Sequence, residues 1–104
     1  MIDAETFAAL ADPTRLDIVT RLARGPATVT QLAEPQDMSL RAVLKHIQIL
    51  ERSAIVTTTK RGRTRSCELR PETLASTARW LTAVEQRWLR RLDRIEQLIE
   101  KERG

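Results

Sequence analysis

The sequence predicts a mainly α-helical fold with one small β-hairpin, and two patterns in its 104 residues support this. Apolar residues recur at helical spacing in several short segments and again through most of the last third of the chain. A β-branched run at residues 55–59 and a second run at residues 65–69 flank Arg61-Gly62-Arg63, which predicts two strands joined by a tight turn. The length allows one domain with a modest core.

Two short helices are predicted before the first Gly-Pro pair. Residues 4–11 form the first helix. Asp12 is a favourable N-cap for the second helix, and Pro13 occupies its first position, where a missing N–H costs nothing. The second helix runs to about residue 24 and ends at Gly25-Pro26. Its expected apolar side consists of Leu16, Ile18, Val19, Leu22 and Ala23.

A pair of short helices with a tight turn between them comes next. Thr28 or Thr30 caps a helix at about residues 29–34, which Pro35 stops, and Ser39 caps a further helix that ends near residue 53. Its expected buried face has the spacing i, i+3, i+7 and i+10 and consists of Leu40, Val43, Ile47 and Leu50. Two short helices followed by a hairpin predict a winged helix-turn-helix, with five helices and a two-stranded wing in all.

The last predicted helix is long. It starts at Pro71 and can run to about Glu100, so its roughly 30 residues span about 45 Å, more than one small domain covers. One set of its residues recurs every seven positions: Leu74, Leu81, Trp88 and Ile95. A second set interleaves with the first: Ala78, Glu85, Leu92 and Ile99. Only Glu85 interrupts this apolar seam, which is most simply buried against a second copy of the chain.

The predicted division of the chain follows from these elements. One domain spans residues 1–104, with the helix-turn-helix at 28–53 and the wing at 55–69. Residues 1–11 and 71–101 are the expected dimerisation helices. The residues expected at the dimer interface are Phe7, Leu10, Leu74, Trp80, Leu81, Trp88, Leu92, Ile95 and Ile99.

Positive charge is concentrated on the fourth helix and the hairpin. Between Met38 and Ser66 there are seven Lys and Arg residues against one acid, Glu51, so this segment has a formal charge of +6 when the whole chain has +4. A cationic helix beside a cationic hairpin predicts binding to double-stranded DNA, with the helix in the major groove and the wing on the phosphates. A membrane surface is the other partner of a basic protein, but it requires one long basic amphipathic helix.

Other classes of protein are not expected. No stretch approaches the ~18 apolar residues of a membrane span, and the N-terminus lacks the basic start and apolar run of a signal peptide. A single cysteine, Cys67, excludes an internal disulfide and suits a reducing compartment, so we expect a cytoplasmic protein. The chain has three glycines and no phosphate-binding or nucleophile motif, so we expect no enzyme. His46 is the only histidine, and we expect neither a metal nor another cofactor.

The candidate DNA-binding residues lie on the helix-turn-helix and the wing. On the fourth helix Gln48 can bond adenine and Arg or Lys can bond guanine, whereas the alternative is an ordinary solvated face. At the third helix a phosphate contact and plain capping are compatible. In the wing the cations either contact the DNA backbone or only protect an edge strand from aggregation. The candidates are Thr28, Thr30, Gln31, Ser39, Leu40, Arg41, Leu44, Lys45, His46, Gln48, Lys60, Arg61, Gly62, Arg63 and Arg65.

Two of these candidates leave specific alternatives open. Leu44 either touches a thymine methyl group or slightly enlarges the core. His46 either contacts DNA, binds a metal, or is a partly buried histidine with a protein partner. A metal ligand needs companions, and the chain offers only Cys67 and scattered acids.

The order of motifs resembles the ArsR-type winged-helix repressors of bacteria. The resemblance rests on FAALADPTRLDIVTRLARG, then TQLAE, then MSLRAVLKHIQILERSAIV and GRTRSCEL, and it covers nearly the whole chain. It implies a homodimer that binds a palindromic operator and represses transcription, often of its own operon. Trp80, Trp88 and WLRRLDRIEQLIE resemble the subgroup without metal ligands, in which the end helix dimerises. Members commonly have Pro, Ser, Arg and Lys where this chain has Arg41, Leu44, Lys45 and Gln48.

Two other functions remain open from the sequence. A winged helix can serve as a protein-interaction module, although such a module does not need the charge on the helix and wing. The repressor can also be switched by an effector, either a small molecule or an oxidant that acts on Cys67. The sequence does not identify an effector.

Overall fold

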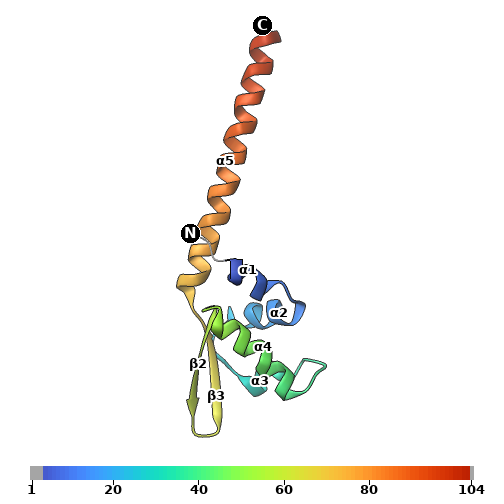
Figure 1. Ribbon diagram of the computed structural model, residues 1–104, viewed down its shortest axis with the longest axis vertical. Coiled ribbons are helices and arrows are strands. Elements are labelled where there is room, and N and C mark those ends of the chain that lie inside the picture. The colour runs from blue at the N-terminus through green and yellow to red at the C-terminus, as the bar shows by residue number, and fades with distance from the viewer. Residues whose placement is uncertain (1–3, 104) are drawn as a thin grey trace.

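The computed structural model describes residues 4–103, which form five helices and a small antiparallel sheet (Figure 1). Of the predicted dimerisation segment 1–11, residues 1–3 lie outside the described residues. The helices are α1 (Ala4–Leu10), α2 (Pro13–Leu22), α3 (Val29–Ala33), α4 (Leu40–Arg52) and α5 (Pro71–Arg103). The strands are β1 (Ala27–Thr28), β2 (Val56–Arg61) and β3 (Thr64–Leu69).

The predicted helix boundaries are confirmed at their caps. The Asp12 carboxylate accepts a hydrogen bond from the N–H of Arg15, and Pro13 is the first residue of α2. Ser39 caps α4 by accepting from the N–H of Ala42. Such side chains satisfy N–H groups that have no partner inside the helix, which is why the helices begin there.

The sheet has three strands, whereas the sequence predicted two. Its order is β1-β3-β2, with Thr28 opposite Ser66 at one side and Lys60 opposite Arg65 at the other. The wing is the β2–β3 hairpin, and Gly62 takes the left-handed conformation (φ +61°) that its turn requires. β1 was missed because a strand of two residues has no periodicity and exists only through its pairing with β3.

The core lies between α2, α3, α4 and the base of the sheet. Its fully buried members include Ile18, Leu32, Ile47, Leu50 and Ile55. Three residues expected on buried faces are exposed: Leu16 (50%), Leu40 (54%) and Ala23. Ala23 is the C-cap, beyond the last residue of α2. Leu16 lies two residues from Ile18 and thus on the opposite side of α2. Leu40 lies on the correct face of α4, but in its first turn, where the helix extends beyond the core.

The long helix α5 projects away from the rest of the molecule (Figure 1). The wing tip and the C-terminal end lie at opposite ends of a molecule about 72 Å long and 26 by 23 Å across. The first turn of α5 is anchored by the Thr73 hydroxyl, which donates to the carbonyl of Ala54 (2.6 Å). Every described residue from Ala78 onward is exposed, so the body of one protomer does not cover α5.

Candidate DNA-binding surface

The exposed face of α4 presents three of the predicted groove residues. Arg41, Lys45 and Gln48 are exposed and spaced i, i+4 and i+7, so they lie on one side of the helix. Val43 and Ile47 point the other way and are buried, which fixes α4 on the core. Within residues 4–103 the three polar side chains make no hydrogen bond or ion pair. They are therefore available to a ligand.

The capping residues of α3 and α4 already have partners. Thr28 and Gln31 form a capping box, in which the N–H of Gln31 donates to Thr28 Oγ1 (3.1 Å) and the N–H of Thr28 donates to Gln31 Oε1 (2.9 Å). This assigns the cap to Thr28, so Thr30 is left exposed in the first turn. The capping alternative is confirmed for Thr28, Gln31 and Ser39, while their contact with DNA stays a prediction.

A hollow of about 450 Å³ separates the helix-turn-helix from the wing. Leu44 is half-buried, packs against the core and also lines this hollow, so the two interpretations of Leu44 are combined. The hollow brings together predicted candidates that are up to 37 residues apart in the sequence, from Thr28 to Arg65. Its lining is Thr28, Val29, Thr30, Leu40, Leu44, Arg63, Thr64 and Arg65.

The wing places like charges side by side. Lys60 and Arg65 are directly opposite each other in the β2–β3 pairing, and Arg61 and Arg63 are exposed at the tip. Like charges opposite each other destabilise a hairpin, so this arrangement does not serve the stability of the sheet. Protection of an edge accounts for cations on β2, which is an edge strand, and for Arg65 on β3, because β1 pairs with β3 only at Ser66 and Cys67. It does not account for two cations directly opposite each other, an arrangement that an anionic ligand would favour.

His46 lies on the side of α4 that faces α2. Its Nδ1 is 3.1 Å from Arg15 Nη1 and 3.7 Å from Asp12 Oδ2, and 22% of its side chain is exposed. Of the three interpretations of His46, the partly buried histidine with a protein partner matches this geometry. Arg15 was not among the predicted site residues, because nothing in the local sequence connects it with a residue 31 positions away.

Comparisons with known proteins place this architecture in a family. Residues 10–59 match the helix-turn-helix domain family. The HTH-type transcriptional regulator Rv2034 of Mycobacterium tuberculosis is 38% identical over 94 residues, which cover 90% of this chain and 85% of that protein. The crystal structure of an ArsR family transcriptional regulator has a TM-score of 0.78 and 42% identity, and the match covers 85% of this chain and 96% of that one.

This chain is a member of the ArsR-type winged helix-turn-helix transcriptional regulators. A homodimeric winged helix-turn-helix DNA-binding domain, Mb0332 from Mycobacterium bovis, has the same fold, with a TM-score of 0.65 and 22% identity over 82% of this chain and 80% of that one. The members found are regulators of transcription, which is the general function of this chain.

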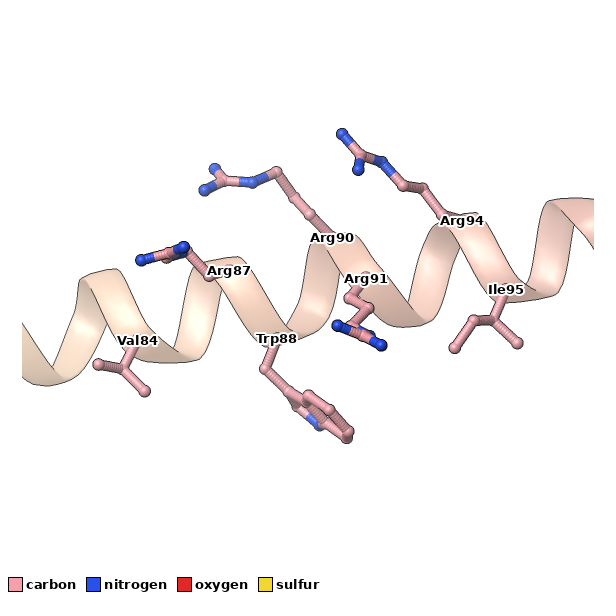
Figure 2. A pocket seen from close by; sticks show the side chains of 7 residues that line it. All are labelled: Val84, Arg87, Trp88, Arg90, Arg91, Arg94 and Ile95. Carbon is pink, nitrogen blue, oxygen red and sulfur yellow. The ribbon is translucent and has the colours of Figure 1, made fainter.

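In this ArsR-type regulator α5 has a broad exposed apolar stripe. Trp88 is 58% exposed and Ile95 is 45% exposed, and both lie on the stripe with Val84 (Figure 2). Arg87, Arg90 and Arg94 point to the other side of the helix (Figure 2). Three further exposed apolar residues were missed in the sequence: Val84, Leu89 and Leu98.

Some predicted interface residues have partners within their own protomer. Leu10 and Leu74 are half-buried and pack against the core. The ring centroids of Phe7 and Trp80 are 5.6 Å apart in an edge-to-face arrangement, which joins α1 to α5. These four residues therefore have a structural role in the single chain, and their contact with a second copy stays a prediction.

The described part of the ArsR-type chain contains neither a metal-ligand cluster nor a reactive thiol. Residues 4–103 bring no three His, Cys, Asp or Glu side chains together in a way that could hold a metal ion. Cys67 is 1% exposed, and burial, followed by the charge of Glu51, raises the pKa of its thiol. A thiol that is buried and protonated is a poor target for oxidants. Among the same residues no helix is long and apolar enough to cross a membrane.

We expect an Asp12→Asn variant to lose stability only at neutral pH. The hydrogen bond from the N–H of Arg15 is the main cause that lowers the pKa of Asp12 below 3.8, and the positive charge of Arg15 contributes. A carboxylate with a lowered pKa stabilises the fold above its unfolded pKa, and this contribution disappears as the pH falls through the folded pKa.

Since Asn caps a helix as well as Asp, the variant isolates the charge, which is worth about 0.5 kcal/mol at a helix N-terminus. Urea unfolding at one fixed protein concentration should show this difference above about pH 5 and none in strong acid. A difference that does not change with pH would contradict the assignment.

Proposed function

We propose that two copies of this chain bind one palindromic promoter operator and repress transcription, with the promoter of its own operon as the first target. The single observation that supports this most is the hollow between α4 and the wing, which brings Leu40 and Leu44 of the cationic helix beside Arg63 and Arg65 of the cationic hairpin. Such a regulator acts on chromosomal DNA, so the cytoplasm is part of the proposal.

In this proposal the exposed face of α4 enters the major groove. Arg41 and Lys45 are long cationic side chains that reach guanine, and the Gln48 amide can make two hydrogen bonds to adenine. Leu40 and Leu44, at the edge of the hollow, give an apolar surface of the kind that contacts a thymine methyl group. Thr30 and the wing cations Lys60, Arg61, Arg63 and Arg65 contact phosphates.

The proposed dimer forms through the apolar stripe of α5. A helix that is exposed on all sides in the single chain and has a stripe of Trp, Leu, Ile and Val needs a partner of the same kind. A two-fold axis would present two α4 helices to successive major grooves, about 34 Å apart along the DNA. The Mb0332 domain, which has the same fold, is a homodimer.

The alternatives have less support. A protein-interaction module would not require the like charges of Lys60 and Arg65 to be opposite each other. Oxidation at Cys67 would require an exposed thiol with a lowered pKa, and this thiol is buried with a raised pKa. A small-molecule effector has no specific observation in its favour.

Selection of bound sequences from random duplex DNA tests the proposal. The expected result is an enriched palindrome whose half-sites are centred about one helical turn or more apart. The same palindrome should also occur upstream of the regulator's own gene. The matched negative experiment uses the same protein in high salt, where binding should be lost. Failure to enrich any sequence at low salt would overturn the proposal.

We expect Gln48→Ala and Arg63→Ala to have different effects on DNA binding. Gln48→Ala removes a base contact, so it should relax the preference at one position of each half-site, worth about 1–3 kcal/mol of discrimination. Arg63→Ala removes a phosphate contact, so it should weaken binding to all sequences alike and reduce the salt slope by about 1 per site. Selection profiles and salt titrations of both variants measure this. If Gln48→Ala leaves the sequence profile unchanged, the groove assignment is wrong.

A further inference from the structure

Arg15 of α2 connects three helices through one guanidinium group. Its Nε donates to the carbonyl of Ala9 (2.5 Å) and its Nη2 to the carbonyl of Ala8 (3.5 Å), both in the last turn of α1. Its Nη1 donates to Nδ1 of His46 in the middle of α4 (3.1 Å). Its backbone N–H is held by the Asp12 carboxylate (3.0 Å), so the position of Arg15 is fixed at both ends.

These contacts are chemically specific on both sides. The last carbonyls of a helix have no partner within it, and a cation near them also interacts favourably with the helix dipole. An arginine can only donate, so Nδ1 of His46 must be an acceptor, which requires the neutral imidazole with its proton on Nε2. A lysine offers no planar group that can reach the two carbonyls and the ring together.

The contacts also continue to the dimerisation helix. Phe7 in α1 packs edge to face on Trp80 in α5, and Arg15 then joins the end of α1 to α4. A chain of contacts from Trp80 through Phe7 and Arg15 to His46 thereby connects α5, the helix that would pair with a second copy, to the recognition helix α4. Apart from this route, α5 is anchored near the C-terminal end of α4 by the bond from Thr73 to Ala54.

We propose that Arg15 is a positioning residue that sets the orientation of α4 relative to α1 and α5, and with it the separation of the two recognition helices in the dimer. This inference rests on the proposed function, because a separation matters only if two α4 helices bind one duplex. Arg15 itself need not touch DNA, and His46 serves as its partner rather than as a base contact.

The first experiment compares Arg15→Gln with Arg21→Gln. Both variants remove one positive charge from α2, but Arg21 makes only an exposed ion pair with Asp17 one turn away (2.9 Å). Arg15→Gln should remain a folded dimer, lose about tenfold or more in operator affinity, and tolerate operators whose half-sites are moved by one base pair in either direction. Arg21→Gln should behave as the wild type in affinity and in spacing preference. A folded Arg15→Gln dimer with unchanged affinity and spacing preference would overturn the proposal.

A second experiment needs no DNA. His46 is the only histidine, so selective ¹⁵N labelling of histidine gives the signals of a single ring. In the neutral ring Nδ1 should be unprotonated and Nε2 protonated, and Arg15→Gln should change this ratio toward that of free imidazole. A ring with its proton on Nδ1 in the wild type would overturn the Arg15–His46 contact. This result is independent of whether any operator is selected, so it separates failure of the inference from failure of the proposed function.

Discussion

A Trp88→Arg/Leu92→Arg double variant is expected to be a monomer that no longer binds the operator. Both side chains are exposed in the single protomer, Trp88 by 58% and Leu92 by 40%, and both lie on the apolar stripe of α5. Burial of one large apolar side chain contributes about 1.5–3 kcal/mol, and a symmetric dimer has each side chain twice. The loss of this burial free energy, together with two unpaired charges added to each apolar stripe, corresponds to at least a thousandfold weaker dimer.

The DNA affinity should fall with the dimer. Two linked winged-helix domains bind a palindrome about 10²- to 10⁴-fold more tightly than one, since binding of the second half-site is intramolecular. The winged-helix body of the protomer should be retained, because Thr77 is the one residue of α5 in the described chain that is buried and both substitutions lie beyond it. Sedimentation velocity and a gel shift on the selected operator measure the two effects.

The matched control is Gln86→Arg/Gln97→Arg. It adds the same two charges to α5 on the side opposite the stripe, where 3.6 residues per turn places both positions. This control should remain a dimer and bind DNA. A double variant at the stripe that stays dimeric, or a control that dissociates equally, would show that the stripe is not the interface.

A Lys60→Gln/Arg63→Gln/Arg65→Gln triple variant is expected to lose at least a hundredfold in operator affinity near physiological salt. Each phosphate contact contributes about 0.9 to the slope of log affinity against log salt, so three contacts in each of two wings contribute about 5. The variant should be no less stable than the wild type, because it removes the like charges of Lys60 and Arg65 from opposite positions in the hairpin. Fluorescence anisotropy at several salt concentrations measures the slope, and thermal unfolding measures the stability.

The control for the wing removes the same number of charges from α5. Arg87, Arg90 and Arg94 point away from the apolar stripe (Figure 2), on a helix that projects away from the wing (Figure 1). At a distance beyond the Debye length of about 8–10 Å their charges are screened from DNA bound at the wing. Their replacement by Gln should leave the salt slope nearly unchanged. Equal slopes for the two triple variants would mean that net charge alone, and not the wing, determines binding.

Local chemistry made much of the fold predictable. The caps at Asp12, Thr28 and Ser39 and the turn at Gly62 depend on single residues and their immediate neighbours, so the sequence indicates them directly. The cationic surfaces of α4 and the wing were also predictable, because they depend only on residue type and on the spacing of residues along each element. For the same reason the family resemblance from motif order is confirmed.

Features that depend on tertiary contacts were not predictable. β1 exists only because β3 lies beside it, and Leu40 is exposed only because α4 extends past the core. The Arg15–His46 contact joins residues on two helices that meet through folding.

Val84, one of the missed apolar residues of α5, was overlooked for a different reason. The seam was sought with a repeat of seven, which describes a supercoiled helix, whereas a straight helix repeats every 3.6 residues. At that period Leu81, Val84, Trp88, Leu92, Ile95 and Ile99 form one stripe. A search at the straight-helix period would therefore have found Val84 in the sequence.

The exposure of α5 from Ala78 onward links helix formation to association. Most helical stability in proteins comes from tertiary packing of an apolar face, and the body of one protomer does not supply such packing to these turns. In the proposed dimer a second copy supplies this packing, so association should stabilise the distal turns, and a freshly synthesised protomer at low concentration should have a tail that proteases cleave more readily. Accumulation of the protein would protect it, so the cellular level at which regulation begins depends on encounter between newly made copies.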